Sequence, residues 1–571
     1  MRKIRCLMKG IFLTTTILAL TGCAASGESD QTSQTDSESN QTSQTDSEEN
    51  LTADCYNGRF VGSVEEETGV LSFKGIPYAK APVGELRWKA PEAVEESDET
   101  YAADTFGKSG IQYEWHSEPI TTERGEDCLT LNVWTSSLED EKKPVMVYFH
   151  GGSFAWGGTS EELYNGQYIV DAHEDVVVVT CNYRLGMMGF IDLSSIPGGE
   201  EYTDSEQLGL LDAIESLRWI QQNIQAFGGD PDNVTIFGES AGSTMVGCLL
   251  ASEETEGLFQ RAICESGSYN LTFSQADYDA SAQAEMLLEA TGASNMDDLL
   301  ALTEEELIEA NELSLDEDET TVNDLYSLPL RGDLVAEDPY EAIAQGAAKG
   351  IDLMIGTNTD EISYWVAEMG EEPMVGMDEE GVQENLSYYE EYFINPLYDY
   401  ILENVSEKDR KNVEKYMELH EDEEELWARS ALITEALFRQ PSIKAAESHA
   451  SSEGSGKTYM YYFGKRSDNF DFIGACHASE LAYVFRNVEE TDFSGTVDSE
   501  LSDRICDAWV NFAKTGDPST EEVSWTEYTA EDRATMMIGD DSSMTMVQDP
   551  DAEGRELLAP LADYYFWSAG A

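Results

Sequence analysis

Basic residues are scarce in this sequence. Its 571 residues include 33 Lys plus Arg against 114 Asp plus Glu, which gives a formal net charge of −81 at pH 7. A surface of this charge repels phosphate backbones and anionic membranes, so we expect no nucleic-acid partner. It also disfavours strongly anionic substrates, and it helps to keep a protein soluble outside the cell.

Histidine and cysteine are also few. There are six His and nine Cys, and no two cysteines stand in a C-x-x-C spacing. The sequence therefore suggests neither a zinc ribbon nor a thioredoxin-type redox site. Nine cysteines are also too few for a disulfide scaffold in a chain of this length.

The apolar run near the start of the chain is too short to span a membrane. Its apolar core, residues 11–20, is about ten residues long, where a transmembrane helix needs about 20. The run follows four basic residues and ends in Leu-Thr-Gly-Cys, which resembles a bacterial lipobox. We therefore expect a lipoprotein signal peptide over residues 1–22, acylation of Cys23, and export to the outer face of the bacterial cell membrane. A plain secretory signal with a chance cysteine is the alternative.

The next segment has the composition of a tether. Residues 26–50 contain no aliphatic or aromatic side chain, and the sequence QTSQTDSE occurs twice. Such a segment cannot bury enough surface to offset its chain entropy. We expect residues 23–53 to be a disordered acidic tether that holds a globular domain off the membrane.

From residue 54 onward the composition is globular, and we expect one domain over residues 54–571. Short buried-strand patterns alternate with helical periodicity, which is typical of a mostly parallel α/β sheet. The predicted strands are residues 144–150, 175–184, 234–237, 262–264, 351–356 and 458–463, and the predicted helices are residues 207–227 and 243–250. Acidic helical stretches at 275–320 and 377–430 are expected to be insertions over the carboxyl edge of the sheet.

The chain is organised around a G-x-S-x-G sequence at positions 238–242. A strand pattern precedes it and a helix pattern follows, which is the context of a nucleophile elbow that exposes the Ser240 hydroxyl. Glycines at Gly238 and Gly242 leave room for the sharp turn. The N-terminus of the following helix would direct N–H groups at a developing oxyanion. A structural Gly-Ser turn is the alternative reading.

A serine nucleophile needs a base and an orienting acid. In the chain order Ser, acid, His that elbow enzymes use, the candidates for the base are His420, His449 and His477. A loop of small residues ahead of an apolar helix favours His477. The acid should follow a strand, and the 351–356 strand leads to Asp360 and Glu361, between which position alone does not choose.

An oxyanion site is also visible. The sequence His-Gly-Gly-Ser at 150–153 follows a predicted strand and matches the HGGG-type loop of esterases, except that Ser153 replaces the third glycine. Its N–H groups, together with that of Ala241, could stabilise a negative oxygen, and each such donor is typically worth a rate factor of ~10²–10³. A simple glycine turn after a strand is the alternative.

Four motifs in order resemble those of the type-B carboxylesterases, the family of bacterial para-nitrobenzyl esterases, mammalian carboxylesterases and cholinesterases. They are FKGIPYA at 73–79, EDCLTLNV at 126–133, the segment from FGGDP to GESAGS at 227–243, and WVNFAKTGDP at 509–518. The similarity extends over about residues 56–567. It implies an α/β-hydrolase fold, with a large mostly parallel sheet flanked by helices and helical insertions over the active site.

The resemblance also assigns roles that spacing leaves open. It implies a Ser240–His477–Glu361 triad, with Glu361 rather than Asp360 as the acid. The N–H donors of the family's oxyanion hole correspond to Gly152, Ser153 and Ala241, and Gly151 adjoins them. Residues expected to support these groups are Glu239 and Ser266, with the Ser266 hydroxyl near the acid, and Glu480 follows His477 in the matching segment.

Three departures from the family pattern stand out. Ile362 replaces the glycine after the acid, Ala478 replaces the glycine after the histidine, and both could shift loop geometry. The usual disulfide partner of Cys128 is missing, so we expect a reduced, buried thiol there. The resemblance does not extend to an aromatic-lined choline site.

Together these features predict a serine hydrolase that cleaves carboxylic esters of small molecules through an acyl-enzyme intermediate, without a metal or organic cofactor. One alternative is a non-catalytic binding or adhesion protein on the same fold. Within enzymes, the alternatives are a short-chain lipase and an amidase.

Overall fold

The computed structural model of this chain describes residues 51–112, 121–139, 142–269, 272–274, 280–313, 328–330, 334–336, 338–368, 377, 379–470, 472–487, 493–564 and 566. The predicted signal peptide (1–22), the acylation site Cys23 and the tether up to residue 50 lie outside the described residues. The predicted end of the tether at residue 53 is wrong by two residues. Strand β1 (Thr52–Cys55) begins at Thr52 because it pairs with β2 (Gly58–Val61) and buries Ala53.

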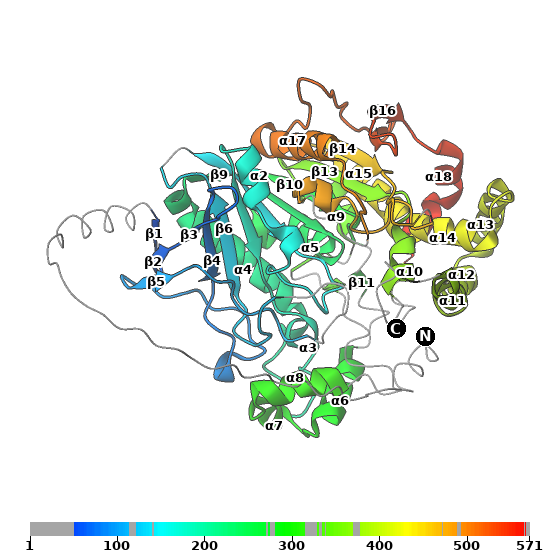
Figure 1. Cartoon of the computed structure of the whole chain (residues 1–571). Coiled ribbons are helices and arrows are strands. Elements are labelled where there is room, and N and C mark those ends of the chain that lie inside the picture. Colours follow the sequence, from blue (N-terminus) through cyan, green and yellow to red (C-terminus); the bar gives the residue numbers. More distant parts are fainter. Residues whose placement is uncertain are drawn as a thin grey trace, which may run out of the picture.

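An 11-stranded sheet forms the centre of the molecule (Figure 1). Its strand order is β16-β15-β14-β13-β10-β9-β7-β8-β6-β4-β3. The strands are β3 (Ser63–Val64), β4 (Leu71–Pro77), β6 (Thr130–Thr135), β7 (Lys143–Phe149), β8 (Val177–Cys181), β9 (Gly229–Glu239), β10 (Arg261–Glu265), β13 (Asp352–Asn358), β14 (Thr458–Phe463), β15 (Ala534–Ile538) and β16 (Met544–Gln548). Strands from β8 to β15 run parallel, and both ends of the sheet are antiparallel. The predicted mostly parallel α/β sheet is confirmed.

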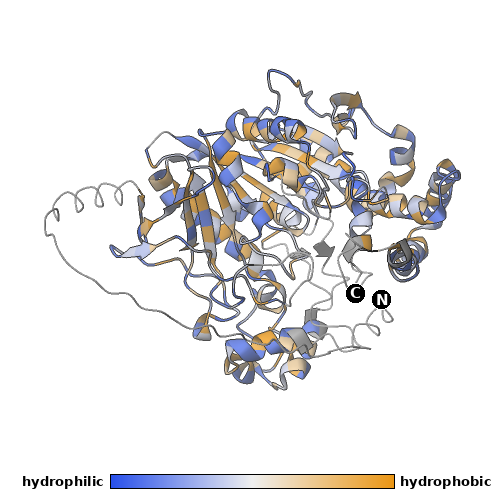
Figure 2. Ribbon diagram, in the orientation of Figure 1, coloured by the Kyte–Doolittle hydropathy of each residue, from blue (hydrophilic) through white to orange (hydrophobic). Residues whose placement is uncertain are grey.

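Helices cover both faces of this sheet, which is why its central strands are buried over most of their length. Side chains alternate between two apolar cores. Val145 and Val147 of β7 face the core that includes helices α4 (Leu208–Asn223) and α5 (Ala241–Leu250), while Met146 and Tyr148 face the core of helix α17 (Ser499–Thr515). Figure 2 shows this as strongly apolar strands in the middle of the molecule.

The register of the parallel strands brings the expected site residues to one edge. Phe149 of β7 lies opposite Gly238 of β9, Glu239 lies opposite Glu265 of β10, and Glu265 lies opposite Gly356 of β13. Parallel strands end at the same edge, so the segments that follow them meet there. This arrangement places Ser240, the 150–154 loop and the 358–361 turn side by side.

The two predicted insertions are helical where the structure describes them. The first contains α6 (Ala280–Thr291), α7 (Met296–Leu300) and α8 (Glu304–Leu313), and the second contains α11 (Glu379–Tyr389), α12 (Asn395–Asn404), α13 (Glu407–Leu419) and α14 (Glu425–Thr434). Figure 1 shows them as two separate lobes beside the sheet. The second lobe packs its apolar residues, including Leu432, against Ile362, the residue after Glu361.

Other elements had no clear sequence signal. A three-stranded sheet, in the order β1-β2-β5 with β5 at Thr100–Ala102, and a two-stranded sheet of β11 (Thr272–Ser274) and β12 (Leu328–Leu330) stand apart from the main sheet. Among the described residues, no helix is both long and apolar enough to cross a membrane.

Candidate active site

Ser240 sits at a sharp turn between β9 and α5. Its backbone has φ 56° and ψ −120°, a conformation that non-glycine residues rarely adopt. The Ser240 N–H donates to the Glu265 carbonyl at 3.0 Å, which ties the turn to the neighbouring strand. A strained residue that persists in a rigid setting is typical of functional sites.

The two glycines of the turn are required by close packing. A Cβ atom on Gly238 would lie 2.6 Å from the Gly242 carbonyl carbon, and one on Gly242 would lie 1.9 Å from the Phe149 carbonyl oxygen. Neither contact is sterically possible with backbone atoms held in place. The expectation that these positions need glycine is confirmed.

The loop after β7 passes directly beside the serine. A Cβ atom on Gly151 would lie 3.2 Å from the Ser240 Cβ. The loop is turned by positive φ values at Gly152 (97°), Ser153 (52°) and Phe154 (58°). Within the described part of the chain, the N–H groups of Gly152 and Ser153 donate to no partner, although the Gly152 carbonyl accepts twice. These N–H groups are therefore available to a substrate oxygen. The same holds for the N–H of Ala241, the first residue of α5, because the first N–H groups of a helix have no partner within it.

The imidazole of His477 is held by Glu361. His477 Nδ1 lies 2.7 Å from Glu361 Oε2, and the other carboxylate oxygen, Oε1, accepts the Asn358 N–H at 2.7 Å. Glu361 is fully buried. The neighbouring Asp360 instead accepts the N–H of Ala475 at 3.0 Å. Of the two adjacent acids, Glu361 is therefore the one whose side chain contacts His477.

The other two candidate histidines lie elsewhere. His420 Nδ1 lies 2.9 Å from Glu423 Oε1, within its own helical insertion. His449 is fully buried, between the Thr458 hydroxyl at 2.7 Å and the Ile351 carbonyl at 3.0 Å. Burial lowers the pKa of His449 to about 4. Neither ring contacts a serine of the elbow.

The second ring nitrogen of His477 faces the elbow. Nε2 lies 3.1 Å from Oε1 of Glu239, the residue immediately before Ser240. Among the described residues, no hydrogen bond links the Ser240 hydroxyl to His477. In resting enzymes catalytic hydrogen bonds are often long and tighten when substrate binds, so this geometry is compatible with a base.

Aromatic rings enclose the imidazole, and sequence analysis missed them. The centroids of Tyr364, Trp365 and Phe438 lie 5.8, 5.5 and 4.9 Å from that of His477. Phe438 belongs to a π-helical segment, η9 (Glu435–Arg439), that follows the second insertion. π-Helical turns occur frequently at functional sites. No motif marks these rings, because they come from two segments, one directly after Glu361 and one after the second insertion, that only the fold brings together.

Buried carboxyl groups lie behind the triad. Glu480 accepts the Ser266 hydroxyl at 3.1 Å, and Glu265 accepts the Trp509 indole N–H at 2.6 Å. Burial, followed by the nearby Glu361 charge, raises the pKa of Glu480 to about 7. Burial, followed by Glu480, raises the pKa of Glu265 well above its usual range. Ser266 therefore supports Glu480 and is not bonded to the acid Glu361.

Replacing Glu480 by Gln should change how stability depends on pH. The pKa of Glu480 is higher in the folded than in the unfolded chain, so the wild-type protein loses stability as pH rises through about 7, where this buried group ionises. The Glu480→Gln variant does not lose stability in this way, because glutamine does not ionise. Relative to wild type, we expect its free energy of unfolding to gain about 2–3 kcal/mol between pH 5 and pH 8. Urea unfolding at both pH values measures this, and a difference that does not change with pH would contradict it.

Two of the departures from the family pattern, Ile362 and Ala478, replace glycines but differ in their backbone conformation. Ile362 has no left-handed backbone conformation, and its fully buried side chain fills the core of the second insertion. Ala478, in contrast, keeps a φ of 63° although it carries a side chain. Only the second substitution therefore strains the loop that carries His477.

Ala478→Gly should therefore stabilise the protein. Glycine adopts this backbone conformation without steric cost, and the gain is only partly offset by greater freedom in the unfolded chain. We expect the free energy of unfolding to rise by about 0.5–1 kcal/mol. Ala475→Gly, in the same loop but without a positive φ, is the control and should be destabilising. Thermal unfolding of both variants tests this, and a lower midpoint for Ala478→Gly would contradict it.

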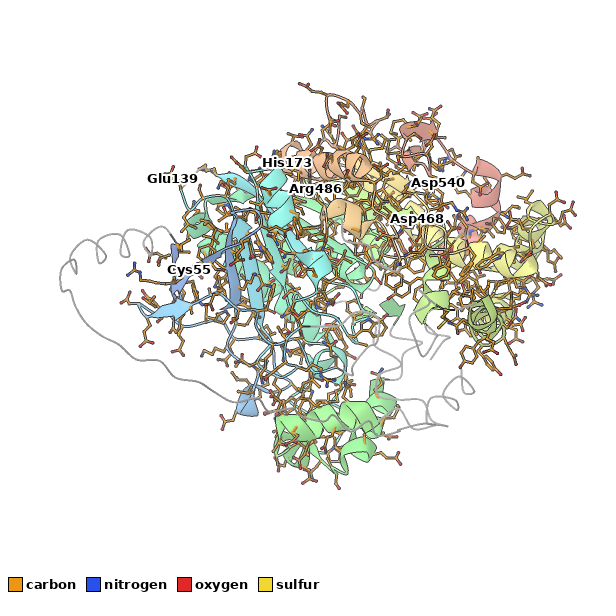
Figure 3. All side chains as sticks on the ribbon, in the orientation of Figure 1. Cys55, Glu139, His173, Asp468, Arg486 and Asp540 are labelled. Carbon is orange, nitrogen blue, oxygen red and sulfur yellow. The ribbon has the colours of Figure 1, made fainter. Side chains whose placement is uncertain are left out.

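The described cysteines are all free thiols, and Cys128 is buried as expected. Cys55, labelled in Figure 3, lies in β1 at the rim of the molecule and is partly exposed. Within the described residues, no group of three or more His, Cys, Asp or Glu side chains is arranged to hold a metal ion.

Comparison with known proteins places this geometry in a family. The sequence model of the carboxylesterase family matches residues 48–553. The chain is 37% identical over 507 residues to para-nitrobenzyl esterase of Bacillus subtilis, which covers 86% of this chain and 96% of that protein. It is 30% identical over 510 residues to carboxylesterase 1D of Rattus norvegicus, and the match covers 82% of this chain and 86% of that protein. A solved PNB esterase structure has a TM-score of 0.71 at 35% identity and covers 89% of this chain and 100% of its own, which shows the α/β-hydrolase fold. The chain therefore belongs to the carboxylesterase family.

Proposed function

We propose that this carboxylesterase-family enzyme hydrolyses carboxylic esters of small molecules, with Ser240 as nucleophile, His477 as general base and acid, and Glu361 as the group that orients His477. The observation that carries the proposal is the position of the His477 ring. One nitrogen is bonded to buried Glu361 at 2.7 Å, and the other faces the residue next to Ser240. The Glu361 contact supports a neutral ring with its proton on Nδ1, so that Nε2 can accept a proton once it turns from Glu239 to the serine oxygen.

In the first half of the reaction, Nε2 of His477 takes the Ser240 proton as the serine oxygen attacks the ester carbonyl carbon. The carbonyl oxygen becomes an oxyanion that accepts the N–H groups of Gly152, Ser153 and Ala241. The intermediate then breaks its bond to the alcohol oxygen, which leaves with the proton from His477. Ser240 retains the acyl group. Water attacks this acyl-enzyme by the same route and releases the acid.

During this cycle the His477 ring must rotate from Glu239 toward the Ser240 oxygen. In the resting protein Nε2 is 3.1 Å from Glu239 Oε1, one residue before the nucleophile. A substrate that occupies the space beside Gly151 and Ser240 would bring the serine oxygen and Nε2 into hydrogen-bond range. Glu239 would then stabilise the imidazolium that forms during attack.

Covalent labelling with a fluorophosphonate probe tests this function. We expect one label per folded chain, on the peptide that contains Ser240, and loss of hydrolysis of a p-nitrophenyl acyl ester in step with labelling. Heat-unfolded protein is the control and should not react. An unlabelled chain would favour a binding protein on this fold. Activity on aggregated long-chain triglyceride rather than soluble tributyrin would indicate a lipase, and release of p-nitroaniline from an acyl anilide would indicate an amidase.

The place of action is part of the proposal. Residues 1–23 predict export and a lipid on Cys23 that holds the enzyme at the outer face of the bacterial membrane. Detergent phase partitioning of the protein produced in bacteria tests it, since an acylated chain enters the detergent phase and a Cys23→Ser chain remains in the aqueous phase.

A further inference from the structure

Asn358 is the last residue of β13, and it makes three hydrogen bonds around the triad. Its backbone N–H donates to Glu361 Oε1 at 2.7 Å. Its side-chain Nδ2 donates to the Cys476 carbonyl at 2.8 Å and to Glu480 Oε2 at 2.5 Å. The side chain is fully buried, so none of these bonds competes with bulk water.

The orientation of the Asn358 amide follows from its neighbours. The Cys476 carbonyl that faces Nδ2 can only accept a hydrogen bond, so the NH₂ group must point toward it, and Oε2 of Glu480 accepts from the same nitrogen. The backbone is equally fixed, because Asn358 pairs with Phe463 in the register of β13 and β14. One rigid residue therefore presents three N–H donors in set directions.

These contacts join two segments that are far apart in the sequence. Glu361 and His477 are separated by 116 residues, and Cys476 is the residue directly before His477. Asn358 holds the carboxylate of the acid with its backbone and the backbone of the histidine loop with its side chain. A second pair of bonds, between Asp360 and Ala475, joins the same two segments nearby. Asn358 itself touches neither His477 nor Ser240.

We propose that Asn358 is the positioning residue of the triad: it sets the distance between Glu361 and His477, and Glu480 fixes Asn358 from behind. The inference rests on the proposed hydrolysis by Ser240, His477 and Glu361. It adds that a side chain outside the triad controls kcat. A displacement of about 1 Å in catalytic groups can lower the rate about 10²-fold, which sets the scale of the effect.

Asn358→Asp tests the proposal because it keeps the shape of the side chain and removes its donors. With a p-nitrophenyl acyl ester we expect kcat to fall about 10²-fold and KM to change less than about threefold. In this variant the new carboxyl group faces Glu480 and shares a proton with it, and the negative charge added when that proton leaves favours the protonated form of the imidazole. The rising limb of the kcat–pH profile should therefore move to higher pH.

A second substitution that exchanges the hydrogen-bond donor and acceptor should restore part of the lost kcat. In Asn358→Asp combined with Glu480→Gln, the glutamine amide can donate to the aspartate, which restores a hydrogen bond between positions 358 and 480. We expect kcat to recover about tenfold over Asn358→Asp, and only partly, because the donor to the Cys476 carbonyl is still missing. A purely structural role would not predict recovery of kcat by this exchange.

Thr357→Val is the matched control. Thr357 precedes Asn358 in the same strand, is fully buried, and its hydroxyl makes no hydrogen bond within the described residues. Its replacement by an isosteric apolar side chain should leave kcat and the pH profile unchanged. An equal loss in Thr357→Val and Asn358→Asp would overturn the proposal, because it would assign the effect to the strand.

All rates are divided by the concentration of sites that react with fluorophosphonate, so unfolded chains are not counted. Should Asn358→Asp yield no folded protein, Asn358→Ser keeps one hydroxyl donor, and an intermediate fall in kcat is expected. A kcat and pH profile equal to wild type in either variant would refute the positioning role. Failure of the hydrolase proposal is distinct, because wild-type protein would then neither react with the probe nor hydrolyse the ester.

Discussion

Replacing Ser240 by Ala is expected to lower kcat for a p-nitrophenyl acyl ester by about 10⁴–10⁶-fold, since covalent attack then has no nucleophile. The residual rate would come from the oxyanion donors and from binding. The fold should be unaffected, because alanine keeps the Cβ atom and the same backbone strain at φ 56°. Rates measured with purified protein, together with circular dichroism, check both parts of this prediction.

A buried serine away from the elbow provides the control for Ser240→Ala. Ser216 lies in α4, is fully buried, and donates its hydroxyl to the Ala213 carbonyl at 2.7 Å. Ser216→Ala should keep its activity and the fluorophosphonate label, and only Ser240→Ala should lose both. Full activity in Ser240→Ala would eliminate Ser240 as the nucleophile.

Replacing Glu361 by Gln should be almost as damaging, for a reason specific to this site. The Asn358 N–H lies 2.7 Å from Oε1 and needs an acceptor, so the glutamine oxygen will take that position. The glutamine NH₂ group is then directed at Nδ1 of His477, which must accept. The ring proton moves to Nε2, the atom that has to receive the serine proton. We expect kcat to fall about 10³–10⁴-fold with little change in KM.

Asp360→Asn is the matched control for Glu361→Gln, since the two acids are adjacent and the sequence did not separate them. Asp360 accepts hydrogen bonds from the Ala475 N–H and the Thr359 hydroxyl, and an asparagine oxygen can accept both. Its kcat should stay within about fivefold of wild type. A larger loss in Asp360→Asn than in Glu361→Gln would exclude Glu361 as the orienting acid.

Much of the architecture is predictable because local patterns determine it. Every predicted strand of the parallel sheet is present, since runs such as residues 234–237 are mostly apolar and are buried at every position. The antiparallel ends are different. Strand β16 has only five residues, all of them exposed or half-buried, so its sequence does not distinguish it from a loop.

The residues of the candidate site also divide into those that the sequence predicts and those that it does not. The glycines around Ser240 are readable because each is required by a steric contact within a short segment. The choice of Glu361 over Asp360 depends on where a loop more than 100 residues later returns to the sheet, and only a family resemblance supplied it. The contact of His477 with Glu239 and the buried pair Glu265 and Glu480 had no local signal at all.

The seven described cysteines, none of them cross-linked and all but Cys55 buried, bear on how this protein matures. Folding of the described domain requires no oxidant or disulfide isomerase, so refolding yield should not depend on the ratio of reduced to oxidised glutathione. Once folded, the interior thiols are shielded from oxidants in the solvent. Oxidative inactivation would then proceed through transiently opened chains, and its rate would report how often the domain opens.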